Sequence, residues 1–216
     1  MTILTEPTES TETMGDLLKR LGDISPDRVR LRPMPGTATE ADVVRIHAHE
    51  KRLFELIDGV LVEKGMGYRE SILAGAILEG LRSWTKPRKL GLVTGADGMM
   101  RLFPGLVRIP DVAYASWERF PNRQVPTEAI PQLVPDLAVE VLSESNTKRE
   151  MNRKRNEYFD AGVRLVWIVD PKTSTIRVYT EPEQFTVLDQ NQILDGGAVL
   201  PGFTYSLRDL FAELTA

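Results

Sequence analysis

Apolar residues in the second half of the chain follow two periods, one typical of strands and one typical of helices. Near-continuous apolar runs predict buried strands at 137–142 and 165–169, and alternation predicts strands at 175–179 and 185–188. Between the first two runs, residues 146–161 show helical spacing and end at a glycine. Two buried strands joined through a helix indicate an α/β fold, with a mixed sheet and helices packed on it.

The first half of the chain predicts shorter elements around a hairpin. Asp58-Gly59 separates two apolar arms within 53–62, as expected for a two-residue turn. The predicted helices are 14–21, 40–50 after a capping Thr37 or Thr39, and 68–84. The predicted strands are 91–94, a strand after the glycine-marked turn 95–98, 107–116 running through Pro110, and a short strand that precedes a final helix within 201–210.

Composition divides the chain into a short N-terminal part and one domain. Residues 1–12 are rich in Thr, Glu, Ser and Pro, which favours a mobile tail. The short helix and a proline-rich connector follow, up to residue 38. The chain of 216 residues suffices for one sizeable core, so we expect the main domain to span 39–216.

Charge and residue content narrow the functional classes. A net charge of −4 excludes binding to nucleic acid through bulk positive charge, so such binding needs a local basic patch. There is no cysteine, and His47 and His49 point to different sides of a helix, which argues against a zinc hydrolase. No apolar run reaches the roughly 18 residues of a membrane helix, and the N-terminus lacks a signal-peptide layout. We therefore expect a cytoplasmic protein without membrane contacts.

Two opposite charges fall on positions that should turn inward. Glu140 shares a strand face with Ala138, and Lys154 shares a helix stripe with Met151 and Tyr158. Burying a lone charge is costly, so the two need a common explanation. Either they form a structural ion pair, or they line a working site. We favour the working site, because a buried ion pair adds little net stability.

A third charge, Asp111, follows Pro110, and the proline predicts that this carboxylate lies at a strand entry or at a bulge. An aspartate beside a proline is by itself more often a turn former. Two carboxylates on neighbouring strands, here Asp111 and Glu140, can however hold a hard cation such as Mg²⁺. Such a cation activates water and polarises a phosphoryl oxygen, while the ammonium of Lys154 orients the water or stabilises developing charge. This set of residues predicts metal-assisted phosphodiester hydrolysis.

Five sequence segments occur in an order that resembles the Uma2 family, a group of endonucleases in the PD-(D/E)XK nuclease superfamily. They are ELIDG at 55–59, PDV at 110–112, EVLS at 140–143, Lys154 four residues before Tyr158, and WIVDP at 167–171. The resemblance covers about residues 39–210. It implies a restriction-endonuclease-like core, with a mixed central sheet flanked by helices and a divalent-metal site at strand edges. It also implies DNA as the substrate, and a homodimer is a reasonable expectation.

The resemblance implies roles for individual residues. Asp111 and Glu140 match the acidic ligands of Mg²⁺ or Mn²⁺, and the backbone carbonyl of Val141 is expected to be a further ligand. The superfamily places its lysine two residues after the second acid, where this chain has leucine. In the Uma2-like pattern the lysine lies on the following helix, and Lys154 fits that place. A long, flexible lysine stem can reach the same point from a helix.

Two further glutamates have less specific implied roles. Glu55 matches the upstream glutamate of the family, as an accessory metal ligand or as a partner of one, and a solvated hairpin carboxylate is the equal alternative. Glu150 is predicted to pair with Lys154 or Lys148 at helical spacing. With Ser143, it is a weaker candidate for the site.

The predicted helix carries five basic residues within 148–155, and we call this stretch the basic segment. Beside a nuclease site it could contact phosphates, as could Arg108, Arg119 and Arg123, although a solvated helix face is the plainer interpretation. Two rival functions stay open. One is a non-catalytic protein of this fold that binds nucleic acid or a protein partner. The other is a hydrolase of a different phosphate ester.

Overall fold

The computed structural model describes residues 13–65 and 67–215, so the predicted mobile tail at 1–12 lies outside the described residues. The helices are α1 (Met14–Arg20), α2 (Glu40–Glu50), α3 (Tyr68–Arg88), α4 (Lys148–Ala161) and α5 (Leu207–Ala212). The strands are β1 (Phe54–Ile57), β2 (Val60–Glu63), β3 (Gly91–Thr94), β4 (Met100–Phe103), β5 (Leu106–Arg108), β6 (Val112–Ser116), β7 (Leu137–Val141), β8 (Leu165–Asp170), β9 (Thr175–Tyr179), β10 (Phe185–Asp189), β11 (Ile193–Gly196) and β12 (Leu200–Ser206).

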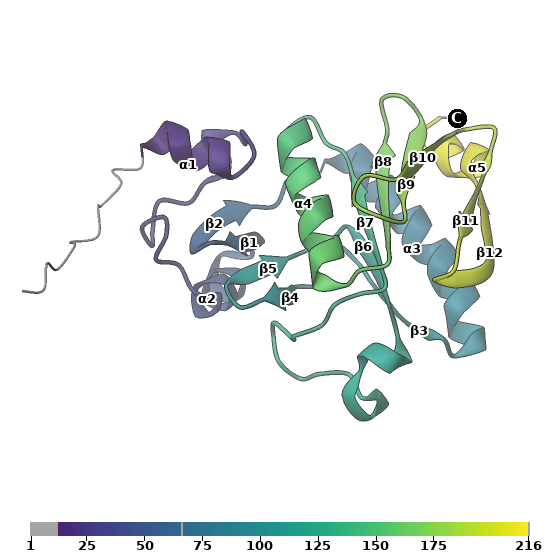
Figure 1. Ribbon diagram of the computed structural model, residues 1–216, viewed down its shortest axis with the longest axis horizontal. Coiled ribbons are helices and arrows are strands. Elements are labelled where there is room, and N and C mark those ends of the chain that lie inside the picture. The colour runs from purple at the N-terminus through teal and green to yellow at the C-terminus, as the bar shows by residue number, and fades with distance from the viewer. Residues whose placement is uncertain (1–12, 66, 216) are drawn as a thin grey trace, which may run out of the picture.

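A six-stranded mixed sheet forms the centre of the molecule, in the order β10-β9-β8-β7-β6-β3. β7 and β8 run parallel and are joined through α4, whereas the other neighbouring pairs are antiparallel. Figure 1 shows α4 in front of this sheet and α3 behind it. The predicted mixed α/β architecture is therefore confirmed, and the parallel pair with its helix is the usual crossover unit.

Alternation along β7 sends its side chains to two separate cores. Leu137, Val139 and Val141 pack in the cluster that includes the buried face of α3. Ala138 packs in the other cluster, which includes residues of α4. Glu140 lies on the same face of the strand as Ala138, because successive strand residues alternate. The strand therefore presents its one carboxylate toward α4.

A second sheet, ordered β2-β1-β5-β4, stands beside the first. Its β1–β2 hairpin pairs Ile57 with Val60 across Asp58-Gly59, as the sequence predicts. Gly59 has φ +72° and lies against the backbone of Gly36, so a side chain there would be both strained and crowded. β11 and β12 form a third, two-stranded sheet at the opposite end of the molecule, and β11 was not predicted.

The predicted single strand at 107–116 is wrong, because the chain leaves one sheet and enters the other within it. β5 belongs to the four-stranded sheet, and β6 belongs to the six-stranded sheet. Pro110 has no N–H for a ladder, and the side chain of Asp111 accepts the N–H of Val141. The break places Asp111 where the two sheets meet. Similarly, α3 runs four residues beyond the predicted end at Trp84, through Pro87 to Arg88.

The N-terminal segment packs onto the main domain. Leu17, Leu21 and Ile24 are buried in the same core cluster as Met151 of α4. Leu17, in the middle of α1, is the helix's buried residue, and Thr13 caps the helix with a capping box. Residues 14–38 therefore share their core with the domain that follows. Among residues 13–65 and 67–215, no helix combines the length and the apolar character needed to cross a membrane.

Candidate active site

The two inward charges predicted from periodicity meet between β7 and α4. The Nζ of Lys154 lies 3.1 Å from both carboxylate oxygens of Glu140. The hydroxyl of Tyr158, one turn further along α4, donates to Oε1 of Glu140. Glu140 and Lys154 are only 5% and 4% exposed. The ion pair is thus formed and buried, and Tyr158 fixes the carboxylate from the same helix.

Glu55 is part of this cluster, so its interpretation as a solvated hairpin carboxylate is wrong. It is 1% exposed on β1, and its Oε1 lies 3.1 Å from the Nζ of Lys154. The same oxygen accepts the backbone N–H of Ile109 at 3.1 Å. Its other oxygen accepts from Arg108 at 2.7 Å. Glu55 therefore connects Lys154 of α4 to Arg108 and Ile109, where the chain passes from one sheet to the other.

Arg108 cannot contact a phosphate as predicted, because it is 1% exposed and each of its three guanidinium nitrogens binds a glutamate. It binds Glu55 from β1 and also Glu157 from α4, through Nε at 2.8 Å and through a second close contact. Burial disfavours its charged form, but the two glutamates outweigh burial and raise the pKa of Arg108 further. Arg108 is a structural cation that joins three elements.

Asp111 is paired with a lysine that the sequence did not identify. The Nζ of Lys64, directly after β2, lies 2.7 Å from Oδ1 of Asp111, and it also donates to the carbonyl oxygen of Ile109. Oδ2 of Asp111 accepts the N–H of Val141 at 2.6 Å. Both side chains of the pair are about 5% exposed. Asp111 thus stands beside the residue that follows Glu140, and Lys64 covers its other oxygen.

The carboxylates of the cluster disturb one another. Burial raises the pKa of Glu140, and the negative charges of Asp111 and Glu55 add to this effect against Lys154 and Lys64. Burial also disfavours ionised Glu55, but Lys154 and Arg108 outweigh it and lower the pKa of Glu55. Burial disfavours charged Lys154, yet Glu140 and Glu55 hold the pKa of Lys154 above its usual value. Three crowded carboxylates are therefore kept together by cations.

The donor set suits a hard divalent cation in type and charge. Asp111 and Glu140 supply carboxylate oxygens from adjacent strands, and Mg²⁺ commonly takes one or two carboxylates and keeps several waters. Burial and the charge of Asp111 both raise the pKa of Glu140, and a cation held by the two carboxylates would offset both effects. Within the described residues, no group of three or more Asp, Glu, His or Cys side chains is arranged to hold a metal. The remaining ligands would therefore be water, a backbone carbonyl or a substrate phosphate.

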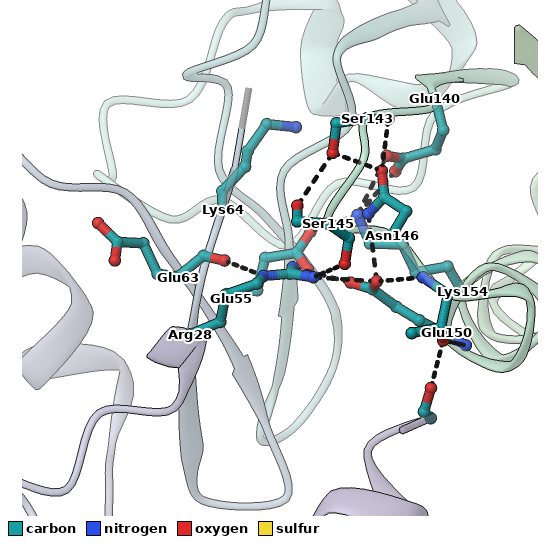
Figure 2. A network of polar contacts seen from close by, with 12 residues as sticks. Arg28, Glu55, Glu63, Lys64, Glu140, Ser143, Ser145, Asn146, Glu150 and Lys154 are labelled. Carbon is teal, nitrogen blue, oxygen red and sulfur yellow. Dashed lines mark hydrogen bonds and ion pairs between the residues drawn. The ribbon is translucent and has the colours of Figure 1, made fainter. Parts of the chain in front are cut away.

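A second charged network borders this cluster, as Figure 2 shows. Arg28 binds Glu150 with two parallel hydrogen bonds of 2.8 and 3.0 Å, and it donates to the carbonyl oxygen of Glu63 at 3.0 Å. Asn146 donates to the same Glu150 at 3.1 Å and accepts the N–H of Ser143 at 2.9 Å. Glu150 therefore pairs with Arg28 from the N-terminal connector, which corrects the predicted partners Lys148 and Lys154 on its own helix.

Only part of the basic segment forms the solvated helix face that was the plainer interpretation, with Lys148 and Arg149 exposed. Lys154 and Arg155 are buried, and Arg155 binds Glu183 at 2.7 Å. The two arginines that remain at the surface each pair with an aspartate of the N-terminal half, Arg149 with Asp23 at 2.8 Å and Arg153 with Asp58 at 2.9 Å. Outside this segment, Arg119 binds Asp136 at 2.7 Å. Most of the positive charge in this region is therefore neutralised within the chain.

A mixed sheet covered on both faces, with acidic residues where two strands meet, defines a restriction-endonuclease-like α/β protein. The family model described as "Uma2: Putative restriction endonuclease" matches residues 40–209, and the chain belongs to this family. A crystal structure titled as that of a putative nuclease belonging to DUF820, from Anabaena variabilis ATCC 29413, is similar in fold. Its TM-score is 0.68 at 21% identity, over 76% of this chain and 93% of that one. No curated protein matches the sequence.

Proposed function

We propose that this protein is a metal-dependent endonuclease that hydrolyses phosphodiester bonds of DNA. The observation that carries the proposal is the burial of two carboxylates in neighbouring places: Asp111 accepts the N–H of Val141, the residue after Glu140, and Glu140 is paired with Lys154 of α4. Family membership supports a nuclease of restriction-endonuclease type. Mg²⁺ or Mn²⁺ is the cofactor that the carboxylate donors favour.

Asp111 and Glu140 would hold the cation, with the carbonyl of Val141 as a further ligand. The cation supplies polarisation of a phosphoryl oxygen and activation of a water molecule. Asp111 is oriented by the N–H of Val141, and Glu140 by the hydroxyl of Tyr158, so neither carboxylate needs to search for its position. Glu55 does not face solvent and acts in this proposal as a positioning residue for Lys154.

Lys154 supplies the positive charge nearest to Glu140. Its ammonium is shared between Glu140 and Glu55. With Glu140 engaged as a metal ligand, the ammonium of Lys154 would stabilise the negative charge that develops on the transferred phosphate. Burial in a low-dielectric site strengthens this interaction. The raised pKa of Lys154 keeps the amine protonated, so it acts by charge and not as a base.

The non-catalytic alternative depends on an open basic face, and the ion pairs of Arg149, Arg153 and Arg155 weaken it. A cytoplasmic location and a homodimer that cuts both strands stay predictions. So does the alternative of another phosphate ester, which small phosphodiester substrates would test.

The proposal is tested by incubating supercoiled and linear DNA with the protein in Mg²⁺ or Mn²⁺. We expect Asp111→Asn and Glu140→Gln to reduce cleavage by about 10²-fold or more, the usual loss when a group that stabilises charge in the transition state is removed. Asp195→Asn, on the distant β11, is the control and should cleave as the wild type does. Full metal-stimulated cleavage by an Asp111→Ala, Glu140→Ala double variant would remove the proposal.

A further inference from the structure

The ammonium of Lys64 is in contact with one of the two carboxylates proposed to hold the metal. It contacts a carboxylate oxygen of Asp111 at 2.7 Å and the carbonyl oxygen of Ile109, two hard oxygen donors of the kind that Mg²⁺ and Mn²⁺ take. It is a charge close enough to affect Glu55 and Glu140 as well. Its side chain is 5% exposed, so it is a built part of the site and not a surface lysine that happens to be near.

Lys64 and Lys154 differ in how firmly they are held. Lys154 lies in the middle of a 14-residue helix and is bound by two glutamates. Lys64 follows the last residue of β2, and Gly65 comes next in the chain. The backbone N–H of Lys64 donates to the carbonyl oxygen of Leu53 at 3.0 Å, so an exchange would move the lysine side chain and leave the hairpin in place. A lysine ammonium is also a point charge on a flexible stem, without the two-pronged geometry of arginine.

We propose that Lys64 is an internal substitute for the divalent cation, and that the metal is loaded by exchange, with Lys64 leaving Asp111 as the metal arrives. This inference rests on the proposed metal site and adds how that site is regulated. The exchange keeps the carboxylates paired in the metal-free protein, and it weakens metal affinity by the cost of displacing an ammonium. The displaced amine is then free to meet an anionic group such as a substrate phosphate.

Calorimetric titration of Mn²⁺ into the wild type, Lys64→Met and Lys86→Met tests the exchange. We expect Lys64→Met to bind Mn²⁺ about tenfold or more tightly than the wild type, because a unit charge in contact with the ligand has been removed. Lys86→Met removes the same charge from the exposed last turn of α3 and should bind as the wild type does. Lys64→Gln keeps a hydrogen-bond donor and replaces Lys64→Met if that variant does not fold. Unchanged or weaker binding by the folded Lys64 variant, or no binding by it at all, would overturn the inference.

The wild-type chain allows a second measurement without a substitution. Acylation of amines, read by peptide mass spectrometry, should be slow at Lys64 without metal and faster at saturating Mn²⁺. Lys154, 4% exposed, should stay slow in both conditions and serves as the internal reference. A Lys64 that stays protected when Mn²⁺ is bound would also overturn the exchange. DNA cleavage separates the two proposals, since tight Mn²⁺ binding by Lys64→Met without any cleavage by the wild type would defeat the proposed function and leave the exchange standing.

Discussion

Two regions of buried charge lie next to each other, and they are built from different cations. In the arginine region, Arg28 grips Glu150 with two hydrogen bonds and Arg108 joins Glu55 to Glu157. In the lysine region, Lys64 and Lys154 hold Asp111 and Glu140 through single ammonium groups. A guanidinium fixes geometry, whereas an ammonium supplies charge and can be exchanged for another cation. The comparison indicates a rigid arginine frame around a site that lysines keep ready for a metal.

Among the substitutions that test this comparison, Arg108→Met should have the largest effect on stability. It leaves the buried Glu55 and the partly buried Glu157 without their common partner, and breaking a buried pair in this way typically costs about 3–5 kcal/mol. We expect a loss of that size in the free energy of unfolding, measured with urea, and Mn²⁺ should not restore it. The double variant Arg108→Met, Glu55→Gln should lose less stability than Arg108→Met alone, because its residue 55 no longer carries an unpaired negative charge. If Mn²⁺ restored the free energy of unfolding of Arg108→Met, a metal cation could also replace the arginine in this region.

Lys64→Gln should behave in the opposite way. Without metal, Asp111 loses its charged partner but keeps the N–H of Val141, and we expect a loss of about 1–3 kcal/mol. Saturating Mn²⁺ should recover most of this loss, since a ligand that binds the folded state stabilises it by mass action. The measurement is the thermal midpoint with and without Mn²⁺. If Mn²⁺ raised the thermal midpoint of Lys64→Gln no more than that of the wild type, Lys64 would be a fixed structural cation like Arg28 and Arg108.

Arg28→Lys tests whether the two-pronged geometry matters. The substitution keeps the charge but loses one of the paired hydrogen bonds to Glu150, and it should cost about 1–2 kcal/mol. Arg30→Lys is the matched control, because Arg30 binds Glu50 with the same two-pronged geometry, at 2.8 Å twice, nearer the surface. Exposed pairs contribute about 0.2–1 kcal/mol, so its loss should be smaller. Equal losses in urea unfolding would mean that burial does not strengthen the Arg28 pair.

Acid should weaken the pair of Arg28 and Glu150. Burial disfavours ionised Glu150, but the hydrogen bond and charge of Arg28, together with the charge of Lys154, outweigh burial and lower the pKa of Glu150 below its ordinary 4.5. The folded state therefore binds this proton less readily than the unfolded state. The contribution is fully present above about pH 4.5 and is lost as the pH falls through the folded pKa. Glu150→Gln should show a shallower acid limb of unfolding free energy, and a limb as steep as that of the wild type would contradict the pairing.

The parts of the site that the sequence predicted lie on regular elements. Glu140 and Lys154 stand out because their neighbours repeat with the strand and helix periods, and both positions are buried as expected. Glu55 could not be placed in this way, since all four residues of β1 are buried and no alternation marks its face. Its partner Arg108 is 53 residues away. Short strands buried on both sides hide their charges from pattern analysis.

Lys64 and Arg28 were missed for a related reason. Lys64 follows a strand whose burial shows no period, and Arg28 lies in a three-residue turn of helix within the connector. Arg28 and Glu150 are 122 residues apart, so only the folded chain brings them together. The split of 107–116 into β5 and β6 has the same origin, because the Val141 N–H that Asp111 accepts belongs to a strand 30 residues later. Local sequence patterns predict helices and strands, whereas the contacts made at the ends of these elements depend on residues far away in the sequence.

The most direct test is calorimetric titration of Mn²⁺ into the wild type and into Glu140→Gln. It is made once with protein alone and once with a non-hydrolysable DNA analogue, whose phosphate can complete the ligand set. Glu150→Gln, a buried carboxylate outside the proposed donors, is the control. We expect Mn²⁺ to bind the wild type and the control, and binding to disappear in Glu140→Gln. Equal binding by all three proteins, or no binding with the DNA analogue present, would contradict a metal site at Asp111 and Glu140.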